Sequence, residues 1–194
     1  MNSGRVEAFS DGVLAIIITV MVLELEPPKE HTSDGLLEAL PVFVSYVVSF
    51  IYISVYWFRH HQLFKKTKEI SKKILWTNLL LLFWVSLIPF TTSWIGSDHV
   101  NIMPVTLYGS VLLFSEISFL ILERSIVKYN KHVSGGTYKL KIDVFFLAIY
   151  ATGLSLGFIN IYFALVGFFL IGILKIGELY YFQSDKVYFS EETK

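Results

Sequence analysis

Six long apolar segments dominate the chain and limit the folds that it can adopt. A helix needs about 20 residues to cross the ~30 Å hydrocarbon core of a bilayer, and each segment has roughly this length. The segments cover residues 6–25, 36–58, 73–95, 100–123, 140–158 and 160–182. We therefore predict an all-α fold: a polytopic membrane protein with six transmembrane helices joined by short connections.

The composition agrees with this class of protein and excludes others. Hydrophobic residues make up 54% of the 194 residues and charged residues 16%, whereas a soluble domain has about 25% charged residues. The absence of cysteine excludes disulfides, thiol chemistry and cysteine-based metal sites. A formal net charge of zero gives no indication of a nucleic-acid partner, and none is expected.

The basic residues predict how the chain is oriented. They concentrate in the loops RHHQLFKKTKEISKK and RSIVKYNKHVSGGTYKLK, which follow the second and fourth apolar segments. The loops expected on the opposite side, EPPKEHTSDG and GSDHVN, contain Lys29 as their only Lys or Arg. Cytoplasmic loops are enriched in Lys and Arg. Both termini are therefore predicted to be cytoplasmic, as an even number of spans requires.

Sequence motifs for enzymatic chemistry are absent. The chain has no Gly-rich phosphate loop, no HExxH and no GxSxG. Its five histidines are divided between the two predicted membrane faces, so they do not make a metal site. We expect neither an enzyme nor a bound cofactor.

The first apolar segment, FSDGVLAIIITVMVLEL at 9–25, has two different faces when it is read as a helix. By the i, i+3, i+4, i+7 rule, one face carries Gly12, Ile16, Thr19, Val20 and Leu23. Asp11 lies about 140° around the helix from Ile16. If one of these faces lines a pathway, the other must pack against neighbouring helices.

Asp11 is the candidate functional residue of this segment, because a carboxylate inside a membrane is costly unless it is paired. Its candidate partners are Arg5, His60 and Asn78, all expected near the cytoplasmic side. One interpretation is a buried polar clamp formed by Asp11, Ser10, His60 and Asn78. The other is a proton or cation relay. We favour the clamp, because buried polar groups need partners whatever the function.

Three further features inside the apolar segments have structural interpretations. Lys175 and Glu178 are three residues apart and are expected to pair on one helix face. Glu116 is compatible with a functional role and equally with snorkelling or packing. Pro89 is expected to kink the third helix, with neighbouring hydroxyls satisfying the freed carbonyl.

Four motifs resemble those of the transmembrane protein 175 family, the endosomal and lysosomal potassium channels and their prokaryotic relatives. They are Arg5-x-x-x-Phe9-Ser10-Asp11, Trp57-x-x-His60, Trp76-x-Asn78 and Pro89-Phe90. The resemblance covers the first half of the chain in motifs and the whole chain in helix count.

This resemblance implies a potassium-selective cation channel without a P-loop filter, with a pore lined by the first helix of each subunit. Animal members carry two six-helix repeats per chain and dimerise, so a single-repeat chain is expected to form a homotetramer. The implied channel domain covers 1–183, followed by a short cytoplasmic tail at 184–194. The implied location is the plasma membrane of a prokaryote, with the lipid bilayer and monovalent cations as partners.

The resemblance also assigns roles on the first helix. The hydrophobic constriction falls on Ile16, with Leu23 further out, and Thr19 matches a threonine linked to potassium preference, with Val20 beside it. Permeating K⁺ is then expected near Ile16 and Thr19. The FSD triplet is expected to brace the first helix against the second and third. The alternatives are a proton- or cation-coupled secondary transporter, with Asp11, His60 and Glu116 as a relay, and a non-conducting scaffold.

Overall fold

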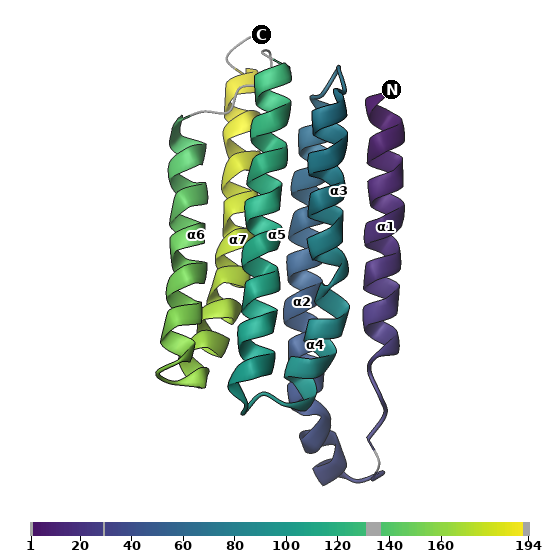
Figure 1. The fold of residues 1–194 in the computed structure, drawn as a ribbon, viewed down its shortest axis with the longest axis vertical. Coiled ribbons are helices and arrows are strands. Elements are labelled where there is room, and N and C mark those ends of the chain that lie inside the picture. The colour runs from purple at the N-terminus through teal and green to yellow at the C-terminus, as the bar shows by residue number, and fades with distance from the viewer. Residues whose placement is uncertain (1, 29, 131–136, 192–194) are drawn as a thin grey trace.

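The computed structural model describes residues 2–28, 30–130 and 137–191, and in these ranges every regular element is a helix (Figure 1). The helices are α1 (Ser3–Leu23), α2 (Ser33–Lys65), α3 (Lys72–Ser86), α4 (Ile88–Ser97), α5 (Ile102–Tyr129), α6 (Thr137–Gly157) and α7 (Ile161–Glu191). Because α3 and α4 follow end to end, the seven helices make six spans. The prediction of an all-α, six-span fold is confirmed.

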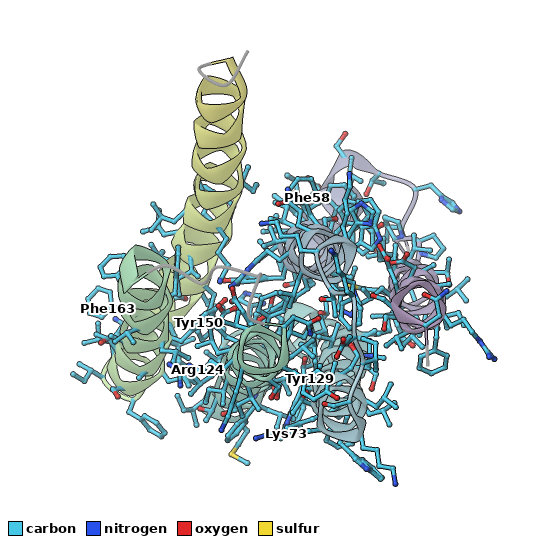
Figure 2. The ribbon with its side chains drawn as sticks, turned by 90° about the horizontal axis from the view of Figure 1, so that it is seen from above. Phe58, Lys73, Arg124, Tyr129, Tyr150 and Phe163 are labelled. Atoms are coloured by element: carbon cyan, nitrogen blue, oxygen red, sulfur yellow. The ribbon has the colours of Figure 1, made fainter. Side chains whose placement is uncertain are left out.

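The spans alternate in direction along the long axis of the bundle, so that α1 begins and α7 ends at the same end of the molecule (Figure 1). Viewed from above, α1 lies on one side of the bundle and the α6–α7 hairpin on the other, with α2, α3 and α5 between them (Figure 2). An even number of spans accounts for this arrangement. The cytoplasmic location of this end remains a prediction from the basic loops.

The span lengths agree with a membrane protein, although two boundaries differ from those predicted. Within the described residues, four segments are long and apolar enough to cross a membrane: Ser3–Leu23, Ser33–Lys65, Lys72–Ser97 and Ile102–Tyr129. The stretches Val144–Gly157 of α6 and Ile161–Gly177 of α7 are shorter and also apolar. Helix α2 continues to Lys65 instead of ending at 58, and α7 continues to Glu191 through most of the expected tail.

The third span is interrupted at Leu87, which ends α3 and precedes α4. Pro89 lies in the first turn of α4, where its missing N–H does no harm. The Thr91 hydroxyl donates to the Leu87 carbonyl (3.2 Å), and the Thr92 hydroxyl donates to the Ile88 carbonyl (2.7 Å). The predicted break near Pro89 is confirmed. The carbonyl that loses its helical donor to Pro89 is that of Val85, and it accepts from the Leu87 N–H and not from a hydroxyl as expected.

Helices α2 and α4 approach each other closely at Gly96. A Cβ atom added to Gly96 would lie 2.9 Å from the Cα atom of Val42 on α2, closer than two carbon atoms tolerate. The obstacle is a backbone atom, so it cannot be relieved by a side-chain rotation. Because Gly96 has no side chain, α4 can pack directly against the α2 backbone at Val42.

We predict that Gly96→Ala lowers the free energy of unfolding by about 1–3 kcal/mol, the usual range for overpacking a tight contact. Gly177→Ala is the matched control, since a Cβ there meets nothing within 4 Å and alanine is the better helix former. Thermal unfolding of both variants in detergent measures the difference. Equal midpoints for the two variants would show that α2 and α4 are not held this closely.

Candidate functional site

Helix α1 is tied to the bundle along one face only. It begins at an N-cap, where the Asn2 side chain accepts from the Gly4 N–H (3.1 Å). Its buried residues recur every three or four positions and therefore lie on one stripe: Val6, Ser10, Leu14, Ile17 and Met21. This stripe packs against α2, α3 and α4. On the opposite face of α1, the residues at 12, 16, 19, 20 and 23 are exposed in the described part of the chain.

A three-residue hydrogen-bonded network fixes the inner half of α1. Asn78 on α3 donates through Nδ2 to the Ser10 hydroxyl (2.9 Å), which donates to the Val6 carbonyl (2.9 Å). His60 Nε2 on α2 lies 2.8 Å from Asn78 Oδ1. Since a carbonyl oxygen only accepts, Nε2 carries the proton in this contact. All three side chains are buried, so the Ser10–Asn78–His60 network joins α1, α3 and α2 inside the bundle.

The structure places the other members of the predicted clamp differently. Asp11 is half-buried, and no hydrogen bond or ion pair joins it to Arg5, His60 or Asn78 among the described residues. Arg5 and Phe9 are exposed. Ser10, the neighbour of Asp11, occupies the position that faces Asn78, since consecutive helical residues point about 100° apart. The sequence had also not indicated the contact between His61 Nδ1 and Glu7 Oε1 (2.7 Å).

The residues predicted to line a pore form the uncovered face of α1. Ile16 is 62% exposed, Val20 is 40% exposed and Leu23 is 80% exposed. Gly12 and Thr19 are exposed as well, and the Thr19 hydroxyl donates to the Ile16 carbonyl (2.8 Å). We call Gly12, Ile16, Thr19, Val20 and Leu23 the α1 stripe. Two of its residues, Ile16 and Val20, line an open groove of about 770 Å³ between α1 and α4, which Glu24 and Phe90 also line.

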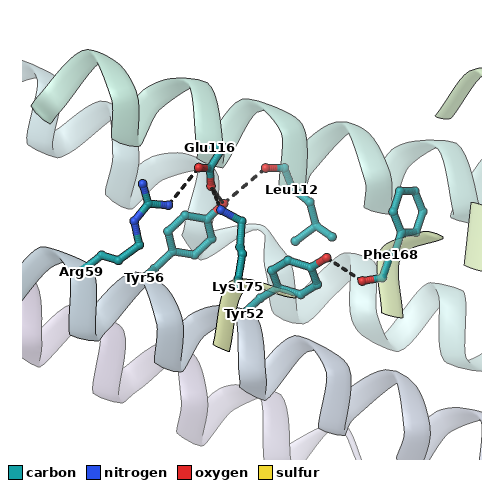
Figure 3. A network of polar contacts seen from close by, with 7 residues as sticks. All are labelled: Tyr52, Tyr56, Arg59, Leu112, Glu116, Phe168 and Lys175. Carbon is teal, nitrogen blue, oxygen red and sulfur yellow. Dashed lines mark hydrogen bonds and ion pairs between the residues drawn. The ribbon is translucent and has the colours of Figure 1, made fainter. Parts of the chain in front are cut away.

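A buried ionic cluster lies on the other side of α2 (Figure 3). Arg59 Nη1 donates to Glu116 Oε1 (2.9 Å), and Lys175 Nζ lies 2.9 Å from Glu116 Oε2. The Tyr56 hydroxyl donates to the same Oε2 (3.2 Å). The Arg59 guanidinium also lies 4.1 Å from the centre of the Phe119 ring, a cation–π distance. Glu116 therefore holds α2, α5 and α7 together.

The cluster gives Lys175 a partner that the sequence had not indicated. Lys175 pairs with Glu116 on α5. The predicted pairing of Lys175 with Glu178 involves a side chain outside the described residues and stays a prediction. Glu116 neither snorkels nor packs as an apolar group, since it is fully buried and ion-paired.

Arg59 and Tyr56 did not stand out in the sequence, because α2 was expected to end at residue 58 and Arg59 was assigned to a basic loop. A periodic signal was nevertheless present. Ser49, Tyr52, Tyr56 and Arg59 recur at helical spacing and are all buried on α2. No group of three or more His, Asp or Glu side chains suited to a metal ion occurs among the described residues.

These features define a multi-pass α-helical membrane protein with one uncovered helix face. Residues 5–89, which include the first three sequence motifs and Pro89 of the fourth, match the model of the family described as endosomal/lysosomal potassium channel TMEM175. A potassium channel of Chryseobacterium sp. is 42% identical over 180 residues, which are 90% of this chain and 92% of that relative. The chain belongs to the TMEM175 family, as its motifs predicted.

Two further relatives extend the comparison. The crystal structure of a lysosomal potassium-selective channel TMEM175 homolog from Chamaesiphon minutus aligns with a TM-score of 0.80 at 26% identity. The alignment covers 91% of this chain and 97% of that one. The endosomal/lysosomal proton channel TMEM175 of Mus musculus is 31% identical over 133 residues, which are 60% of this chain and 27% of the mouse protein.

We predict that Asn78→Ala destabilises the fold more than Asp11→Ala does. Asn78→Ala removes two hydrogen bonds and leaves His60 Nε2 buried without a partner, which costs about 1–3 kcal/mol. Asp11→Ala removes no side-chain hydrogen bond to another described residue. Thermal unfolding midpoints in detergent compare the two variants. A larger loss for Asp11→Ala would show that Asp11 finds its partner in the assembled protein.

Proposed function

We propose that the chain is a potassium-selective cation channel of the plasma membrane, in which α1 of each subunit lines the pore. The observation that carries this proposal is the two-sided character of α1. One face is held by buried contacts and the Ser10–Asn78–His60 network. The other face presents the α1 stripe without cover. The names of the bacterial relatives, potassium channels, support the same function.

The chemistry of the α1 stripe suits a pore without a carbonyl filter. A narrow ring of Ile16 side chains excludes water and raises the barrier to ions, so the pore gates by dewetting. Selectivity then depends on the cost of shedding water and on the oxygen of Thr19, whose own proton is donated to the Ile16 carbonyl. Glu24, at the end of α1, lines the same groove and attracts cations towards it.

A pore of this kind requires several subunits, because one chain supplies one α1. We predict a homotetramer with α1 nearest the axis. Mass measurement of the purified protein in detergent checks the subunit number, and a monomer or dimer alone would contradict it. The chain has no cysteine, so Leu23→Cys should form disulfides between subunits. Phe163→Cys on α7, on the far side of the bundle from α1 (Figure 2) and 55% exposed, should not.

The constriction is tested by Ile16→Asn. A polar ring lets water enter, so the current should rise, and potassium preference should fall because ions no longer shed their hydration shells. Leu23→Ala should widen the pore further out, with a smaller effect. The measurements are current and reversal potential in planar bilayers under a potassium/sodium gradient. Ile173→Asn on α7, 47% exposed, is the matched control and should leave both unchanged.

Unchanged conductance and selectivity in Ile16→Asn, at normal protein levels, would place the pore away from α1. The wild-type recordings also decide between classes of protein. Single-channel steps indicate a channel, slow coupled flux a transporter, and silence a scaffold. Because the mouse relative is named a proton channel, the same bilayers should be tested with a proton gradient.

The structure gives little support to the transporter relay of Asp11, His60 and Glu116. His60 faces α3 and binds Asn78, whereas Glu116 binds Arg59 and lies on the side of α2 that faces α5 and α7. Both Glu116 oxygens already contact a cation, and the carboxylate is fully buried. No chain of hydrogen bonds joins the Ser10–Asn78–His60 network to Glu116 among the described contacts. The channel is therefore the function that the geometry favours.

A further inference from the structure

Two adjacent residues of α2 connect two separate buried networks. His60 reaches towards α3 and α1 through Asn78 and Ser10. Arg59, the preceding residue, reaches towards α5 and binds Glu116. Neighbouring positions on a helix point about 100° apart. The two contacts can therefore form together only when α2 has one particular orientation about its own axis. A small rotation of α2 would lengthen both contacts.

Glu116 occupies the centre of the second network. Its side chain is 0% exposed, and it receives Arg59 on Oε1 and both Lys175 and Tyr56 on Oε2 (Figure 3). Lys175 is 1% exposed and lies over the Phe146 ring at 4.4 Å from its centre. The carboxylate therefore holds the inner part of the α6–α7 hairpin and α2 against α5. It touches neither α1 nor the α1 stripe.

We propose that Glu116 is a positioning residue for the pore helix, acting through Arg59, His60 and Asn78. The carboxylate sets the rotation of α2, α2 places His60, and His60 holds the Asn78 side chain that binds Ser10 on α1. The inference rests on the proposed function only where ion currents are measured. Its structural part, the link from Glu116 to the His60–Asn78 hydrogen bond, holds whether or not the chain conducts.

Electrostatics gives the direction of the effect. Removing the charge of Glu116 leaves the buried Arg59 and Lys175 beside a neutral amide. Breaking a buried ion pair by neutralising one partner is strongly unfavourable, because the other charge stays desolvated. Loss of the Arg59–Glu116 ion pair lets Arg59 shift relative to α5, and α2 turns with it. His60 turns with it and lengthens its contact with Asn78.

The test uses the full-length protein in lipid nanodiscs with ¹⁵N-labelled histidine. The His60 ring signals are assigned by their loss in His60→Gln. In Glu116→Gln we expect the Nε2 resonance to leave its hydrogen-bonded position, and in bilayers the open probability to change by about tenfold, within the range for coupled contacts. The single-channel conductance should stay unchanged, because Glu116 lies away from the α1 stripe.

Three further variants separate positioning from a general loss of packing. Arg59→Gln should shift the His60 resonance as Glu116→Gln does. Lys175→Met keeps the Arg59–Glu116 pair and should leave His60 in place. Ser115→Ala removes a buried hydroxyl next to Glu116 that makes no hydrogen bond, and it should change nothing. A His60 shift in Lys175→Met or Ser115→Ala equal to that in Glu116→Gln would overturn the proposal.

An unshifted His60 resonance in folded Glu116→Gln would also overturn it. If Glu116→Gln does not fold, Arg59→Lys gives the same test, since a lysine keeps the charge but loses the planar geometry of the guanidinium. A wild-type protein that conducts no ions would contradict the proposed function. It would leave the His60 measurement valid, so the two failures are distinguishable.

Discussion

The carboxylate of Glu116 is the interaction on which the packing of the bundle centre depends. Arg59 and Lys175 are buried in the apolar interior, where a charge without a partner is very costly. One carboxylate contacts both cations, and Tyr56 donates to it as well. Helices α2, α5 and α7 are therefore held in one arrangement by buried ionic contacts to one carboxylate.

Helix α2 passes this constraint to the first helix. The Ser10–Asn78–His60 network begins one residue after Arg59, so the position of α1 depends on a helix whose other side is fixed by charge. Helix α1 makes few other polar contacts. Its remaining contacts are apolar, and they come from a single stripe of buried residues that begins at Val6 and ends at Met21. This arrangement leaves the opposite face of α1 exposed.

A pore built from such helices would differ physically from a carbonyl filter. The stripe offers aliphatic surface, the hydroxyl of Thr19 and the Glu24 carboxylate near one end. Its control over ions would come from hydration and from the spacing of the helices. Small rotations of α1 would then change the radius at Ile16 directly. In such a pore, the contacts that orient α1 would be as relevant to conduction as the residues that face the ions.

The sequence by itself determined the six spans, the break at Pro89 and the two faces of α1. These follow from span length, proline chemistry and helical periodicity, which are local properties. The family was also readable from motifs within residues 5–89. Only the tertiary structure decided that Ser10, not Asp11, meets Asn78, and that Lys175 binds Glu116. Those pairs join residues 68 and 59 positions apart, so their partners depend on how the helices pack and rotate.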